Sequence, residues 1–227
     1  MKFYSIASSS AGNCYLVDDG QTKILLECGL PIARIRKVVG NLSQVSACLV
    51  SHLHKDHSRS CTALMQHAVD VYGPENLGLN GHRWHPVVPG EIFQAGSFMV
   101  KSFSAVHDVP CLGYILQSGK DKLLFLIDSA YCPCKIEGLT HIAIECNYDR
   151  QTLHERVAAG QMSGDEVKRI VANHFGLESL VEMLKANDLS ELWEIHLLHM
   201  SDRNGNEERI LGTIKEATGA PVFVARK

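Results

Sequence analysis

The chain has 227 residues, of which 45% are hydrophobic and 21% are charged, as expected of a globular protein. Its formal net charge of −3 excludes a broad basic field, so affinity for nucleic acid would have to come from a local patch or from bound metal. No run of residues approaches the roughly 18 apolar positions of a membrane span, and the N-terminus lacks the core of a signal peptide. We therefore expect one cytoplasmic domain over residues 1–227, without membrane association. Its eight cysteines are expected to be reduced thiols, including the pair Cys132 and Cys134, for which metal binding is the alternative.

The first half of the chain predicts three strands and two helices. Residues 13–17 and 23–28 are predicted strands on either side of a turn at 18–20. Pro31 and Gly40 bound an amphipathic helix, because proline favours the first helical turn and glycine the position after the last. An apolar strand at 47–51 follows, and then a helix at roughly 59–69.

The second half alternates apolar strands with helices. Strands are predicted at 99–107, 123–128, 141–146 and 193–199, and helices at 163–173, 177–187 and 206–218. The first of these helices begins with a capping box formed by Ser163 and Glu166. Groups of strands with helices between them indicate an α+β fold, and the simplest design is an αββα sandwich of two mixed sheets packed face to face with helices outside.

Four side chains that can bind metal lie within six residues, directly after the strand at 47–51. They are His52, His54, Asp56 and His57. A turn this rich in imidazole and carboxylate is poor core material, but these groups suit zinc, manganese or iron. The turn therefore predicts a metal site, and its density favours two ions over one.

Three later strands also end at metal-competent residues, namely His107, Asp128 and His199. If these ends lie at one edge of the sheets, their side chains converge with the turn on a binuclear site. One ion would be bound by His52, His54 and His107, the second by Asp56, His57 and His199, and Asp128 would bridge both. The alternatives are a surface pair of His107 with Asp108, a turn cap at Asp128, and His196 in place of His199.

The order HxHxDH, then His, Asp and His at these intervals, resembles the metallo-β-lactamase fold superfamily of binuclear hydrolases. The resemblance covers nearly the whole chain and is greatest to the small YycJ/WalJ-type exonucleases. It is supported by the segments 8–14 (SSSAGNC), 144–149 (IECNYD) and 198–204 (LHMSDRN), which resemble the Ser/Gly-Asn, Glu-Ser-Asn and His-Leu-Ser segments of that branch.

The resemblance implies a role for each of these residues. The metal ligands would be His52, His54, Asp56, His57, His107, Asp128 and His199, with Asp56 also orienting the attacking hydroxide. Asn13, Asn147 and Ser201 would bind the substrate, and both asparagines could instead bind the ligands or simply form turns. Two departures stand out: Glu27 replaces the usual Asp that supports the metal loop, and His174 keeps its place without the family's following Ser and Asn. His174 is either the general acid for the leaving oxygen or a buried histidine at a helix start.

We expect a metal-dependent phosphodiesterase in which metal-bound hydroxide attacks phosphorus, with nucleic acid as substrate and a 5′-exonuclease as the first choice. The metals would be two divalent ions, zinc before manganese or iron. Because the basic clusters at Arg34, Arg36 and Lys37 and at Lys168 and Arg169 are short, a phosphodiesterase for cyclic or other small nucleotides is the alternative. A non-catalytic, metal-stabilised interaction module is the second alternative, and a homodimer is compatible with the sequence.

Overall fold

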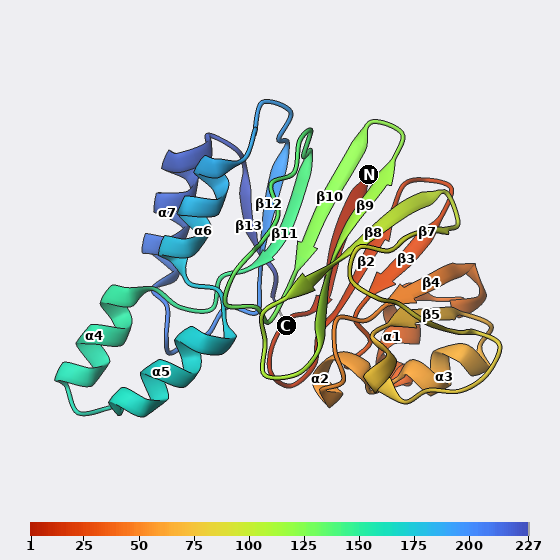
Figure 1. The fold of residues 1–227 in the computed structure, drawn as a ribbon, viewed down its shortest axis with the longest axis horizontal. Coiled ribbons are helices and arrows are strands. Elements are labelled where there is room, and N and C mark those ends of the chain that lie inside the picture. Colours follow the sequence, from red (N-terminus) through yellow and green to blue (C-terminus); the bar gives the residue numbers. More distant parts are fainter. Residues whose placement is uncertain (227) are drawn as a thin grey trace. The chain divides into compact units, whose positions relative to one another are not determined.

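The computed structural model describes residues 1–226, and its strands form two mixed sheets (Figure 1). The chain divides into two compact units. Unit 1 comprises Met1–Ser104, Val109–Asp121 and Arg226, and unit 2 comprises Ala105–Asp108 and Lys122–Ala225. Among the described residues no helix is long and apolar enough to cross a bilayer.

Unit 1 contains a six-stranded sheet in which the strands follow one another in chain order. Its strands are β1 (Lys2–Ala7), β2 (Cys14–Asp18), β3 (Lys23–Leu26), β4 (Val45–Leu49), β5 (Asp70–Gly73) and β6 (Trp84–Pro86). β1 to β3 pair antiparallel, and β3 to β6 pair parallel. Leu26 pairs with Leu49, so the residues that follow β3 and β4 leave the same edge of this sheet.

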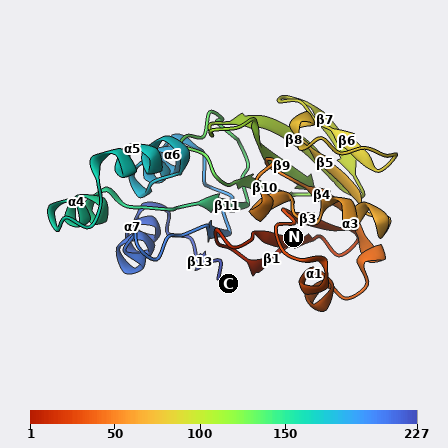
Figure 2. The ribbon, with the colours of Figure 1, turned by 90° about the horizontal axis from the view of Figure 1, so that it is seen from below.

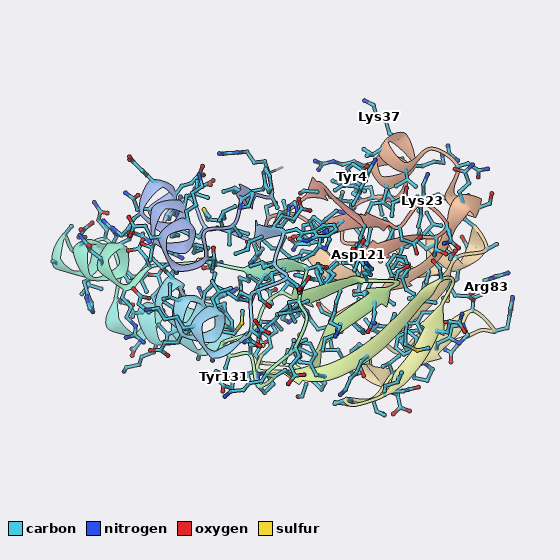
Figure 3. All side chains as sticks on the ribbon, turned by 90° about the horizontal axis from the view of Figure 1, so that it is seen from above. Tyr4, Lys23, Lys37, Arg83, Asp121 and Tyr131 are labelled. Atoms are coloured by element: carbon cyan, nitrogen blue, oxygen red, sulfur yellow. The ribbon has the colours of Figure 1, made fainter. Side chains whose placement is uncertain are left out.

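Helices cover one face of this sheet. They are α1 (Ile32–Val39), α2 (Lys55–Ser58) and α3 (Cys61–Gln66), with 3₁₀ turns at Leu42–Gln44 and Glu75–Leu77. Ile35 of α1 and Leu64 of α3 join Leu25 and Val71 of the strands in one buried cluster. The opposite side of α1 is exposed, and Lys37 extends outward from it (Figure 3). Unit 1 also carries β7 (Ile92–Ala95), all but the last residue of β8 (Phe98–Ala105), and β9 (Cys111–Ser118), and β7 and β8 form a hairpin.

Unit 2 is built on four parallel strands in the order β13-β12-β11-β10. They are β10 (Asp121–Leu126), β11 (His141–Glu145), β12 (Glu194–Leu198) and β13 (Val222–Val224). All of β11 and the last four residues of β10 are buried, as parallel strands covered on both faces require. The helices are α4 (Arg150–Ala158), α5 (Gly164–Asn173), α6 (Leu177–Ala186) and α7 (Glu207–Thr218). α6 packs on α7 and α7 on β13, whereas α4 lies at the end of the unit farthest from the strands (Figures 1 and 2).

The helices predicted at 163–173, 177–187 and 206–218 are confirmed as α5, α6 and α7, and the helix between Pro31 and Gly40 as α1. The helix predicted at roughly 59–69 is present as the shorter α3, Cys61–Gln66. A separate short helix, α2, begins at Lys55 inside the metal-competent turn and was not predicted, and a break at Ser60 separates it from α3. The helix α4 and the strands β1, β5, β6, β7, β9 and β13 were not predicted.

Each strand predicted to run into a candidate ligand ends one or two residues earlier. β4 ends at Leu49, β8 at Ala105, β10 at Leu126 and β12 at Leu198. The reason is conformational at two of the ligands, because Asp128 and His199 have φ of 47° and 48°, in the left-handed region that a strand excludes. These side chains therefore leave the sheet instead of continuing its alternation.

Candidate metal centre

In unit 1 the metal-competent turn follows β4 and places its imidazoles side by side. His52 and His57 are fully buried, and their ring centroids are 4.2 Å apart. His52 Nε2 lies 3.0 Å from His54 Nδ1, and the other nitrogen of His52 lies 2.8 Å from the hydroxyl of Ser51. Asp56 Oδ2 lies 3.3 Å from His57 Nε2. The turn thus brings its four predicted ligands together.

The backbone of the segment after β3 holds this turn. The Cys28 amide donates to the His57 carbonyl at 2.7 Å, and the Asn13 amide donates to the Asp56 carbonyl at 2.7 Å. The Gly29 amide closes the arrangement by donating to the Asn13 carbonyl at 2.9 Å. A Cβ at Gly29 would lie 1.6 Å from the Asp56 carbonyl oxygen, so only glycine allows this approach.

Two buried polar side chains contact His57. Glu27 accepts a hydrogen bond from the Ser51 amide at 3.0 Å, and its second oxygen lies 3.5 Å from His57 Nδ1. Burial raises the pKa of Glu27, and His57 opposes that rise. Asn13 Nδ2 lies 3.1 Å from His57 Nε2, while Asn13 Oδ1 accepts from Tyr15 and from the Ser9 amide. Glu27 therefore supports the turn despite replacing the usual Asp, and Asn13 contacts a predicted ligand.

In unit 2 the ends of three strands bring a second cluster together. Asp128, Glu145, His174 and His199 each offer a ligand atom, and these atoms lie within 4.8 Å of one another. His199 Nδ1 lies 3.0 Å from Asp128 Oδ1 and 2.9 Å from Glu145 Oε1. His174 Nδ1 lies 2.7 Å from the same Glu145 oxygen. The predicted ligands Asp128 and His199 are thus neighbours, and Glu145 joins them to His174.

The two carboxylates govern the charge of both histidines. Burial lowers the pKa of His174, but Glu145 and Asp128 outweigh it and raise that pKa to about 10. The pKa of His199 is raised to about 9 by the same carboxylates against the same effect of burial. The cluster therefore attracts positive charge, which is the electrostatic condition for binding a cation.

The remaining predicted residues of unit 2 lie around this cluster or beside it. The side chain of His107 is 5% exposed, with Nδ1 3.2 Å from the Asn173 carbonyl and Nε2 3.1 Å from Asp108. Asn147 Nδ2 donates to the His199 carbonyl at 3.0 Å, and the Ser201 hydroxyl oxygen accepts from two amides of its own loop. His196 contacts Glu194 and stacks on Phe223, so it does not replace His199.

The donor sets fit divalent metal. Two nitrogens at the usual 2.0–2.1 Å from one tetrahedral zinc ion are about 3.3 Å apart, close to the 3.0 Å between His52 and His54. Donors on opposite sides of one ion are at most about 4.4 Å apart, similar to the spread of the unit 2 cluster. Histidine and carboxylate accept zinc, manganese and iron alike, so the residues fit the metal class without selecting one. Within the described chain, none of the cysteines forms a disulfide and none belongs to a metal-competent cluster.

Glu145 is a member of the unit 2 cluster that the sequence did not single out. It closes a fully buried strand, and its segment resembled a family motif, but its role depends on the register of two parallel strands. Glu145 pairs with Leu198, which places its carboxylate beside the following residue, His199. A buried acid at the end of an apolar strand was the available signal.

Comparison with known proteins agrees with this fold. Residues 9–98 match the model of the Metallo-beta-lactamase superfamily. The structure is similar to that of the metallo-beta-lactamase fold protein YhfI from Bacillus subtilis, with a TM-score of 0.76, 18% identity, and coverage of 99% of this chain and 95% of that one. It is also similar to Zn(2+)-bound PqqB from Methylobacterium extorquens, with a TM-score of 0.71, 13% identity, and coverage of 100% and 98%. The chain is therefore a metallo-β-lactamase-fold protein, as its sequence predicted.

Two curated relatives are similar to this chain over most of its length. The exodeoxyribonuclease WalJ of Streptococcus pneumoniae serotype 2 (strain D39) is 23% identical over 91% of this chain and 84% of its own length. The exodeoxyribonuclease YycJ of Bacillus anthracis is 24% identical over 92% of this chain and 85% of its own length. The resemblance to the YycJ/WalJ-type branch is thus confirmed.

Proposed function

We propose that this protein is a binuclear metal-dependent phosphodiesterase that removes nucleotides from the 5′ end of nucleic acid. The observation that carries the proposal is the chemistry of the two clusters. Unit 1 offers three histidines and an aspartate as donors, and unit 2 offers Asp128 and His199 with Glu145 and His174 beside them. Similarity to two exodeoxyribonucleases over about nine-tenths of the chain supports nucleic acid as the substrate class.

The ions would be held by the seven residues predicted from the sequence, His52, His54, Asp56, His57, His107, Asp128 and His199. When bound, two such ions lower the pKa of a water molecule and neutralise an anionic oxygen of the substrate. Glu27 and Glu145 would orient ligand imidazoles through the nitrogens that they contact, a role that outer carboxylates commonly have in metal sites. Zinc remains the first choice, with manganese or iron as alternatives.

The protein groups would then move the protons. Asp56 is 26% exposed on its side chain, so its carboxylate can accept a hydrogen bond from the attacking water. His174 would donate a proton to the leaving oxygen from Nε2, because Glu145 lies 2.7 Å from Nδ1 and fixes the ring. Of the three residues predicted to bind substrate, Ser201 keeps its hydroxyl proton for a phosphate oxygen, whereas Asn13 and Asn147 would act mainly through the ligands they contact.

A matched pair of histidine variants tests the metal assignment. His199→Ala should lower the metal content and abolish cleavage of a 5′-phosphorylated single-stranded oligodeoxynucleotide, whereas His196→Ala, three residues away on the same segment, should leave both unchanged. Cleavage of cyclic mononucleotides without cleavage of the oligonucleotide would favour the small-nucleotide alternative. Two bound ions with cleavage of neither would support the interaction module and refute the proposal.

The role of His174 has a separate test that uses the leaving group. His174→Gln should slow hydrolysis of DNA by about 10²- to 10⁴-fold, the usual contribution of a general acid. The same variant should retain most activity on a p-nitrophenyl phosphodiester, whose leaving group departs without a proton. Equal losses on both substrates would show that His174 has another task, such as binding metal.

A further inference from the structure

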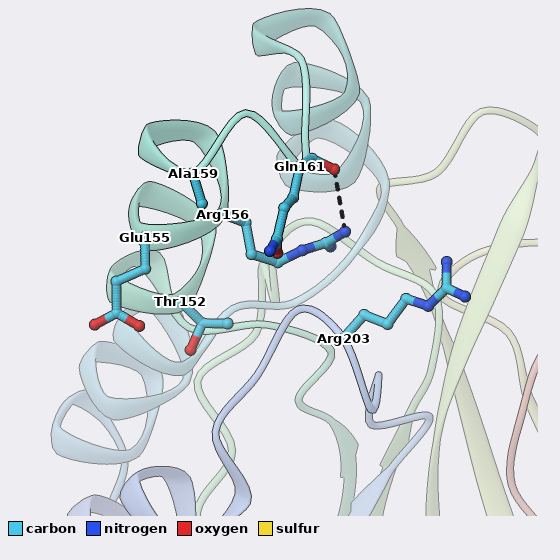
Figure 4. Close-up of a pocket in the computed structure, with 6 residues that line it drawn as sticks. All are labelled: Thr152, Glu155, Arg156, Ala159, Gln161 and Arg203. Carbon is cyan, nitrogen blue, oxygen red and sulfur yellow. Dashed lines mark hydrogen bonds between the residues drawn. The ribbon is translucent and has the colours of Figure 1, made fainter.

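Unit 2 contains a pocket that the proposed chemistry does not use. It has a volume of about 540 Å³ and is lined by α4 and the segments at 159–161 and 203 (Figure 4). The lining residues are Thr152, Glu155, Arg156, Ala159, Gln161 and Arg203. This volume lies in the range of roughly 300–1,000 Å³ that is usual for ligand sites.

The charge of the pocket is positive. Among the described residues, no ion pair joins Arg156 or Arg203 to a carboxylate. The one acid of the lining, Glu155, points away from both guanidinium groups (Figure 4), accepts from Gln151 at 2.9 Å and lies 4.0 Å from Arg209. The C-terminal end of α4 adds only about half a negative charge. Two uncompensated guanidinium groups therefore dominate the pocket.

One of these arginines is held in place, and the other can adjust. Arg156 is half-buried and donates to Asn204 Oδ1 at 2.7 Å and to the Gln161 carbonyl at 3.4 Å. A guanidinium group has five N–H donors, so Arg156 retains donors for a ligand. Arg203 is exposed and extends from the neighbouring loop (Figure 4). A fixed and an adjustable guanidinium group together suit the oxygens of a phosphate.

The pocket is connected to the metal-competent cluster of its own unit. Arg203 follows His199 by four residues, so their Cα atoms are at most about 14 Å apart. The intervening loop is fixed, because the Ser201 amide donates to the Asn147 carbonyl and Asn147 donates to the His199 carbonyl. In a double helix each strand carries a phosphate every 3.4 Å of axis, so at most about four nucleotides span this distance, and fewer where a single strand is extended.

We propose that Arg156 and Arg203 form a binding site for a backbone phosphate of the nucleic-acid strand, a few nucleotides from the bond that is cleaved. The inference rests on the proposed function for the identity of the strand. The pocket would hold the polymer. KM for DNA should therefore depend on the two arginines, whereas the rate of the chemical step at the cleaved bond should not.

The primary test measures binding without turnover. Wild type, Arg203→Gln and Arg150→Gln are titrated into a fluorescein-labelled single-stranded 12-mer with metal present, at low temperature and over a series of KCl concentrations. Arg203→Gln should weaken binding about tenfold and lower the slope of log affinity against log salt by about 0.7, the value for one phosphate contact on a single strand. Arg150→Gln is the matched control, because it removes the same charge from the exposed start of α4, outside the pocket.

A second measurement separates this proposal from the proposed function. Hydrolysis of bis(p-nitrophenyl) phosphate, which has no polymer backbone, should be the same in Arg203→Gln and wild type. If wild type cleaves neither this ester nor DNA, the proposed function fails, and the binding series still decides the role of the pocket. The proposal is overturned if Arg203→Gln and Arg150→Gln have the same affinity and salt slope. It is also overturned if Arg203→Gln weakens the binding of a mononucleotide as much as the binding of the 12-mer.

Discussion

The approach of Gly29 to the metal-competent turn gives the sharpest prediction of the structure. Gly29→Ala adds a Cβ 1.6 Å from the Asp56 carbonyl oxygen, 2.1 Å from the Asp56 carbonyl carbon and 2.8 Å from the His57 amide nitrogen. Ordinary van der Waals contact begins at 3.4 Å, so the two backbones must separate by roughly 1.8 Å. No rotamer change can relieve this contact, because the clashing atoms belong to the main chain.

This shift should affect both metal binding and stability. A displacement of about 1 Å can cost roughly 10²-fold in rate, so we expect Gly29→Ala to lose at least that factor in phosphodiester hydrolysis and to bind fewer ions. The separation also weakens the three backbone hydrogen bonds that hold the turn, worth about 1 kcal/mol each, and should lower the free energy of unfolding by up to about 3 kcal/mol.

The assay combines elemental analysis, urea unfolding and hydrolysis of bis(p-nitrophenyl) phosphate. Gly212→Ala is the matched control, since Gly212 lies within α7 and its added Cβ meets nothing within 4 Å. That control should gain up to about 1 kcal/mol of stability from helix propensity and keep its activity. If Gly29→Ala has the same metal content, stability and rate as wild type, the claim that this glycine holds the turn is refuted.

Three further changes probe the same architecture. Glu27→Gln should lower the affinity for metal by about 10- to 100-fold by weakening the hold on His57, which equilibrium dialysis against a competing chelator would measure; unchanged affinity would contradict this role. Asp128→Asn should reduce the metal content below two ions per chain, and two retained ions would exclude the bridging role. Partial burial raises the pKa of Asp19, but four hydrogen bonds outweigh it and lower the pKa to about 2 from 3.8. The ionised carboxylate therefore stabilises the fold fully above pH 3.8, and this stabilisation is lost as the pH falls toward 2. After solvent screening this is worth about 1 kcal/mol, so Asp19→Asn should be less stable than wild type at pH 6 and closer to it at pH 3, and a gap that widened on acidification would reverse the sign.

The sequence was most informative where all the residues that indicate a site lie in one short segment. The turn at 52–57 could be predicted because its density of imidazole and carboxylate has no role in a core. The helix α4 could not, because Leu153 is its only buried residue and a helix of this kind has no apolar periodicity to detect. Glu145 was missed for a third reason, since only the parallel register of β11 and β12 brings it to His199.

The backbone offers an independent reason to regard these strand ends as functional. In the described chain four residues other than glycine have positive φ, and three of them, Glu27, Asp128 and His199, lie one or two residues after the ends of β3, β10 and β12. Such conformations cost of order 1 kcal/mol or more, so they persist only where surrounding contacts over-determine them. Each of the three side chains takes part in a histidine–carboxylate contact within its unit. Glycine at these positions would remove both the strain and the contact. Retention of the strained residue at all three places is therefore best explained by what the side chains bind rather than by the stability of the fold.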